Sequence, residues 1–108
     1  MIGLADFDLT GRRALVTGGS DGLGRQFTEA LLDAGASVVI CSRRKDSLDQ
    51  TVAELSKRYS LISSVTCDVT DKEDVDRLAR EVGEIDVLVN NAGLAHRAAW
   101  DEEQSEEW

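Results

Sequence analysis

A glycine-rich turn is the first feature of this sequence that could do chemistry. Four glycines stand among the seven residues of the run Gly18-Gly19-Ser20-Asp21-Gly22-Leu23-Gly24. Glycine takes positive φ and lets the backbone approach a ligand closely. Where such a turn opens a helix, the first amides and the helix dipole favour an anion. We therefore expect an anion-binding turn, in which Gly22 and Gly24 serve binding rather than folding. Its binding residues are predicted to be Gly18, Ser20, Asp21, Gly22, Leu23 and Gly24.

A basic cluster follows about 20 residues after this turn, in the run Ser42-Arg43-Arg44-Lys45. In a β-α-β unit the anion at a glycine turn is most often a dinucleotide pyrophosphate, and the residue at this later position meets the adenosine ribose. A carboxylate there accepts from the 2′-hydroxyl, whereas a guanidinium can pair with a 2′-phosphate. Ser42, Arg43 and Arg44 therefore favour NADP(H) over NAD(H), although the charge of Asp21 counts against this.

Apolar runs alternate along the chain with segments of helical periodicity. They predict the strands and helices that would hold these residues in place. Strands are predicted at 13–17, 37–41, 61–67 and 85–89, the first two of them buried, and helices at 23–35, 45–59 and 71–82. Gly35 and Gly83 end the first and third helices, and Thr70 is the predicted N-cap of the third. The inner face of the first helix is predicted to be Leu23, Phe27, Ala30, Leu31 and Ala34. The alternation predicts a parallel sheet with helices on both faces.

The glycine turn and two later motifs together resemble the short-chain dehydrogenase/reductase family. The family's Thr-Gly-x-x-x-Gly-x-Gly pattern is matched by Thr17, Gly18, Gly22 and Gly24. The run Cys67-Asp68-Val69 resembles the stretch after the family's third strand, and Asn90-Asn91-Ala92-Gly93 is its motif after the fourth. The resemblance covers residues 9 to about 108 and implies a Rossmann-type three-layer α/β/α fold with strand order 3-2-1-4.

The resemblance also implies roles for residues of the later motifs. Asp68 would accept a hydrogen bond from the adenine amino group, and the Val69 amide would lie beside the ring. Asn90 would brace the sheet, while Ala92 and Gly93 would leave room for the ribose and the nicotinamide. The implied function is that of an oxidoreductase interconverting alcohols and carbonyls with NADP(H), of which this chain would be the nucleotide-binding part.

No catalytic residue is assigned in this sequence. The family uses a serine and a Tyr-x-x-x-Lys motif beyond the matched region, whereas Tyr59 has Ser63 four places on and is predicted to be a core residue. The chain is thus expected to be an incomplete, single dinucleotide-binding domain, with 94–108 irregular or a short helix. A non-catalytic nucleotide-binding module without turnover is the alternative, and a methyltransferase of similar topology is a distant third.

Composition narrows the class of protein further. The chain has 108 residues, with 12 lysines and arginines against 21 aspartates and glutamates, and its net charge of -9 argues against nucleic-acid binding. Apolar residues make up 42%, and no run of them is long enough to span a bilayer. Cys41 and Cys67 are expected to be buried hydrophobes in a reducing, cytoplasmic compartment.

The remaining expectations concern metal ions and partners. His96, the single histidine, is expected in an exposed loop, and no residues show metal-ligand spacing. The apolar strand at 85–89 would form one edge of the sheet. Since such an edge pairs readily with another chain, we expect self-association through it.

Overall fold

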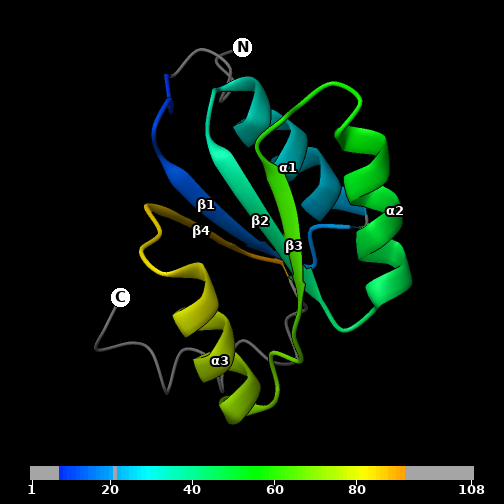
Figure 1. Cartoon of the computed structure of the whole chain (residues 1–108), viewed down its shortest axis with the longest axis vertical. Coiled ribbons are helices and arrows are strands. Elements are labelled where there is room, and N and C mark those ends of the chain that lie inside the picture. Colours follow the sequence, from blue (N-terminus) through cyan, green and yellow to red (C-terminus); the bar gives the residue numbers. More distant parts are fainter. Residues whose placement is uncertain (1–7, 21, 92–108) are drawn as a thin grey trace.

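The computed structural model describes residues 8–20 and 22–91, which form a parallel sheet flanked by helices. In chain order the elements are β1 (Arg13–Thr17), α1 (Gly22–Asp33), β2 (Ser37–Ser42), α2 (Lys45–Leu55), β3 (Ile62–Thr66), α3 (Lys72–Val82) and β4 (Val87–Asn90). All strand pairs are parallel, and the strand order is β3-β2-β1-β4 (Figure 1). The predicted alternation and strand order are confirmed.

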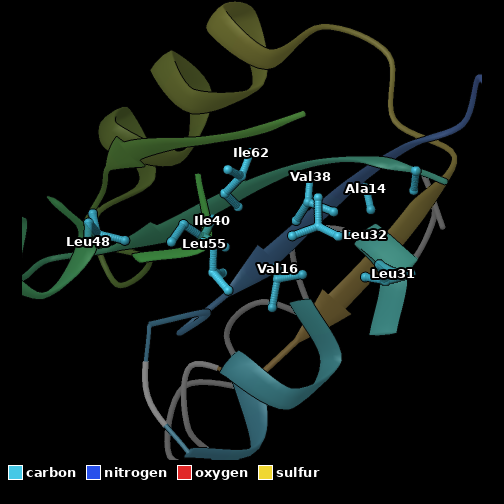
Figure 2. Close-up of a cluster of buried hydrophobic side chains, with 10 residues drawn as sticks. Ala14, Val16, Leu31, Leu32, Val38, Ile40, Leu48, Leu55 and Ile62 are labelled. Atoms are coloured by element: carbon cyan, nitrogen blue, oxygen red, sulfur yellow. The ribbon is translucent and has the colours of Figure 1, made fainter. Parts of the chain in front are cut away.

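Two hydrophobic clusters hold the helices to opposite faces of the sheet. Figure 2 shows the first cluster, in which side chains of α1 and α2 meet those of the strands; its buried members are Ala14, Val16, Leu31, Leu32, Ala36, Val38, Ile40, Leu48, Leu55 and Ile62. The second lies beneath α3 and comprises Leu15, Val39, Cys41, Cys67, Val75, Leu78 and Val82. Because β1 and β2 contribute to both clusters, they are apolar without alternation, as expected for central parallel strands.

The carboxyl ends of the four strands meet at one edge of the sheet. Thr17 at the end of β1 lies opposite Cys41 of β2 and Asn90 of β4, and Ser42 lies opposite Thr66 of β3. This register places the glycine turn, the basic cluster and the Asn-Asn pair at the same edge.

The inner face of α1 differs from the prediction. The buried residues are Gly24, Thr28, Leu31 and Leu32, whereas Leu23 and Phe27 are 56% and 36% exposed. The small residues face inward because the helix begins directly against the turn after β1. The Thr28 hydroxyl donates to the Gly24 carbonyl at 2.9 Å, which allows this polar side chain to be fully buried.

Several element boundaries also differ from the prediction. The N-cap of α3 is Asp71 rather than Thr70: the Asp71 carboxylate accepts from the Glu73 N–H at 3.0 Å, while the Thr70 hydroxyl donates to Asp68 instead. α2 ends at Leu55, before a turn, and β4 begins at Val87. Gly35 and Gly83 end their helices with positive φ, as predicted. Among the described residues, none of the helices has the length and apolar character that a bilayer crossing requires.

Candidate functional site

A cavity of about 260 Å³ opens at the carboxyl edge of the sheet. It is lined by Gly18, Cys41, Ser42, Arg43, Arg44, Cys67, Asp68, Val69, Thr70 and Asn91. The lining therefore draws on the glycine turn, the basic cluster, the loop after β3 and the end of β4. In this fold class ligands bind at this edge, where the chain crosses from one side of the sheet to the other.

At Gly24, the start of α1 approaches the backbone of the glycine turn so closely that a side chain would not fit. A Cβ on Gly24 would lie 2.1 Å from the Gly18 carbonyl oxygen and 2.7 Å from Asn91 Nδ2. A Cβ on Gly22 would meet no atom within 4 Å, although its φ of +47° favours glycine. Gly24 was predicted to serve binding rather than folding. The structure gives it a packing role, because the absence of a side chain lets α1 lie against the turn. Of these two glycines, Gly22 is the one that faces open space.

Ser20 is the buried polar residue that the structure leaves unexplained. It is 7% exposed, and its Oγ has no hydrogen-bond partner among the described residues. Its carbonyl oxygen accepts from Thr51 Oγ1 of α2 at 3.3 Å, which fixes the turn from behind. Because buried hydroxyl groups are normally hydrogen-bonded, Ser20 Oγ can bond to a group that binds at the turn.

Arg43 and Arg44 form the basic rim of the cavity. Both are exposed, and the described part of the chain offers neither guanidinium a carboxylate partner, in contrast to Lys45, which pairs with Asp49 at 2.6 Å. The Arg44 N–H donates to Ser42 Oγ at 3.0 Å, which leaves the Ser42 hydroxyl hydrogen available to another acceptor. The two guanidiniums give this side of the cavity a local positive charge in an otherwise acidic chain.

The loop after β3 forms the opposite wall. The Asp68 carboxylate accepts from the Thr70 N–H at 2.9 Å and from the Thr70 hydroxyl at 2.6 Å. The Asp68 N–H in turn donates to Asp74 of α3 at 2.8 Å. Asp68 and Val69 are half-buried, so an acceptor group and a backbone segment face the cavity together.

Thr17 ties the ends of β1 and β4 together. Its fully buried hydroxyl donates to Asn90 Oδ1 at 3.0 Å and accepts from the Asn91 N–H at 2.8 Å. Asn90 is held in the sheet by this bond, and Asn91 is the residue of the pair that lines the cavity.

Cys41 and Cys67 lie on the cavity wall and belong to the second hydrophobic cluster. Burial raises the pKa of Cys41 to about 12, with the neighbouring Cys67 adding to the shift, and burial raises the pKa of Cys67 to about 11. Both are free thiols. Within the described ranges, no group of three or more possible ligands is placed to hold a metal ion.

Tyr59 lies away from the cavity. Its ring packs partly buried against the first hydrophobic cluster, and its hydroxyl donates to Asp33 of α1. This is a structural position, in line with the prediction that Tyr59 is a core residue. Asp21, Ala92, Gly93, His96 and the stretch 94–108 lie outside the described residues.

Four of the lining residues were not predicted as site residues: Cys41, Cys67, Thr70 and Asn91. The two cysteines and Asn91 stand at or just beyond strand ends, which was a usable signal. Thr70 enters the cavity lining because its hydroxyl turns back to Asp68. Among the predicted residues, Ser20, Gly22, Leu23 and Gly24 lie in the turn or in α1, outside the cavity lining.

The strand order, the helices on both faces and the glycine turn after β1 define a Rossmann-type α/β protein. The chain belongs to the short chain dehydrogenase family, whose model matches residues 12–108. This is a family of oxidoreductases.

Individual relatives agree with this assignment. A short chain dehydrogenase/reductase of Colletotrichum higginsianum is 46% identical over 93 residues, which cover 82% of this chain and 35% of that protein. A rhamnolipids biosynthesis 3-oxoacyl-[acyl-carrier-protein] reductase of Pseudomonas aeruginosa is 42% identical over 97 residues, covering 86% and 38%. The solved Pseudomonas aeruginosa RhlG/NADP active-site complex is similar, with a TM-score of 0.76 and 39% identity over 89% of this chain and 40% of that one. The chain therefore spans less than half the length of these relatives.

Proposed function

We propose that this chain binds NADP(H) at the carboxyl edge of its sheet, as the nucleotide-binding part of an oxidoreductase that interconverts alcohols and carbonyls. The observation that carries the proposal is a single cavity lined by Gly18, Arg43, Arg44 and Asp68. These residues suit a phosphorylated adenine dinucleotide. The glycine turn would take the pyrophosphate, the guanidiniums a further phosphate, and the Asp68 carboxylate the adenine amino group. The similarity to the RhlG/NADP complex supports the same choice.

The pyrophosphate would lie at the start of α1. That helix begins at Gly22, so its first amides and its dipole favour an anion there. Gly22 leaves open space in front of the turn, and the unpartnered Ser20 hydroxyl would donate to a phosphate or ribose oxygen. Leu23 and Gly24 complete the binding turn; the exposed Leu23 side chain would cover the bound cofactor.

The adenosine end would lie between the basic rim and the loop after β3. Arg43 and Arg44 would grip the 2′-phosphate, with the Ser42 hydroxyl donating a further hydrogen bond. Across the cavity, Asp68 would accept from the adenine amino group, and Val69 would lie beside the ring.

The nicotinamide end would lie beyond β4. Asn90 would brace the sheet through Thr17, while Ala92 and Gly93 would leave room for the ribose and the nicotinamide. When bound, the cofactor would supply hydride transfer; the residues of this chain would bind and orient it.

The test is an equilibrium titration of the purified protein with NADPH and NADH. We expect NADPH to bind at least about tenfold more tightly, because losing one charge-assisted hydrogen bond costs about 1.5–3 kcal/mol. Arg43→Ala and Arg44→Ala should each weaken NADPH binding by roughly 10-fold or more and leave NADH binding nearly unchanged.

Arg80→Ala is the matched control, since it removes an exposed guanidinium from α3. It should leave the preference for NADPH in place. Equal affinities of the wild type for the two nucleotides would refute the proposed selectivity, and absence of binding to either would refute the proposed function.

A further inference from the structure

Two charged residues of α3, Asp74 and Arg77, reach across to the loop that forms one cavity wall. Asp74 Oδ2 accepts the Asp68 N–H at 2.8 Å. Arg77 donates to Asp74 Oδ1 through Nε and Nη2, at 3.2 and 3.1 Å. The same Nη2 donates to the carbonyl oxygen of Thr66, the last residue of β3, at 2.6 Å.

These bonds hold the chain on both sides of Cys67. Thr66 is fixed directly by Arg77, and Asp68 is fixed through Asp74, so the exit of β3 cannot move independently of α3. The helix itself is anchored in the second hydrophobic cluster by Val75, Leu78 and Val82. The packing of α3 therefore holds the backbone of Asp68, and Thr70 orients the carboxylate that this backbone carries.

The Arg77 guanidinium offsets part of the repulsion between the adjacent carboxylates of Asp68 and Asp74. The hydrogen bonds from the Asp68 N–H and from the Arg77 guanidinium lower the pKa of Asp74 below its usual value, and they outweigh the opposing effects of burial and of the Asp68 charge. Asp74 thus stays ionised beside Asp68 at neutral pH. Removing Asp74 would take away the acceptor of the Asp68 N–H and leave Arg77 with its remaining carboxylate partner, Glu81, at 3.1 Å.

We infer that Asp74 and Arg77 are positioning residues that hold the backbone of Asp68 in place, so that its carboxylate selects an amino group over a carbonyl at position 6 of the bound purine. This inference rests on the proposed function, since it assigns the adenine end of the dinucleotide to Asp68. An ionised carboxylate only accepts hydrogen bonds. Such a carboxylate accepts a hydrogen bond from the amino group of adenine, and it is repelled by the carbonyl oxygen of hypoxanthine. The selection requires a fixed Asp68 backbone, because a loop that is no longer held by Asp74 can carry the carboxylate and Thr70 together away from the unfavourable base.

The test compares binding of NADPH with binding of its deaminated analogue, reduced nicotinamide hypoxanthine dinucleotide phosphate. The wild type should prefer NADPH by at least about tenfold, as expected for one hydrogen bond to a charged group. The preference should fall below about threefold in Asp74→Ala. It should fall less in Asp74→Asn, because the amide oxygen still accepts the Asp68 N–H. NADPH-over-NADH selectivity should stay unchanged in both variants, since Arg43 and Arg44 are untouched.

Glu81→Gln is the matched control, since it removes the other carboxylate that Arg77 contacts and leaves the bonds to Thr66 and Asp74 in place. It should keep the wild-type preference for adenine. If the wild type binds no NADPH, the proposed function itself fails. If the wild type discriminates between the bases and both Asp74 variants retain that discrimination, or if Glu81→Gln loses it equally, the positioning role is overturned. Should Asp74→Ala fail to fold, Asp74→Asn decides: a preference for adenine below that of the wild type supports the positioning role, and a preference equal to it overturns the role.

Discussion

Replacing Gly24 by alanine is the sharpest test of how α1 packs against the glycine turn. The added Cβ would lie 2.1 Å from the Gly18 carbonyl oxygen, whereas carbon and oxygen normally approach to about 3.3 Å. The obstacle is backbone, which is itself bonded into the sheet through the Gly18 N–H to Cys41 at 2.8 Å. The helix would therefore have to move away from β1 by roughly 1 Å.

The size of the effect follows from two opposing terms. Overpacking of this kind costs about 3 kcal/mol, while alanine in place of glycine inside a helix contributes about 1 kcal/mol of stability. We expect a net loss of about 2 kcal/mol in the free energy of unfolding, or roughly 8–16 °C in melting temperature for a domain of this size. Urea and thermal unfolding followed by circular dichroism would measure it.

The matched control is a pair of variants at the exposed Gln26, in the same helix. Gln26→Ala should be more stable than Gln26→Gly by about 1 kcal/mol, which gives the helix-propensity term without any clash. If Gly24→Ala proves as stable as the wild type or more so, the close approach of α1 to Gly18 is not a constraint and the reasoning fails.

Four further outcomes are expected. Thr17→Val should destabilise the protein by about 1–3 kcal/mol because the Asn91 N–H loses its acceptor, whereas Thr17→Ser should retain most of the stability; chemical unfolding of the two compares them. Asp71→Ala should lower the free energy of unfolding by about 1 kcal/mol, because α3 loses its N-cap. Chemical unfolding would measure this, and an unchanged unfolding midpoint would contradict the capping bond. Cys41 and Cys67 should react slowly with iodoacetamide at pH 8 in the native protein and rapidly in urea. Because their folded pKa values are raised above 9.0, the unfolded state loses these protons first, so stability should fall as the pH rises from about 9 to about 12. Finally, β4 pairs only with β1 among the described residues, so sedimentation velocity should detect self-association through that edge, and a single monomeric species at all concentrations would argue against it.

Much of the fold was readable from local patterns in the sequence. Three of the strands centre on short apolar runs, β3 carries β-branched residues at Ile62, Val65 and Thr66, and each helix has apolar residues at helical spacing. The alternation of strands and helices could therefore be predicted with errors only at the ends. Parallel pairing then requires the residues after every strand to meet at one edge. For this reason Gly18, Arg43, Arg44, Asp68 and Val69 could be expected to lie together before the register was known, and the structure does place them around one cavity.

Contacts between elements far apart in the sequence could not be predicted in this way. Periodicity alone favoured Leu23 and Phe27 for the inner face of α1, whereas the helix is turned so that Gly24 and Thr28 face inward. That rotation depends on how closely the helix approaches Gly18, which no pattern within the helix records.

The support of Asp68 by Asp74 and Arg77 could not be predicted from the sequence either. From the sequence, charged residues on the outer face of a helix are expected to be solvated. Nothing in their spacing indicates that Asp74 reaches the backbone of the preceding loop. The sequence by itself determined which elements form and which ends carry the polar groups, because those signals are short-range. The tertiary structure decided how closely the elements approach and which side chains hold the site, because those depend on the packing of side chains brought together only when the sheet and helices assemble.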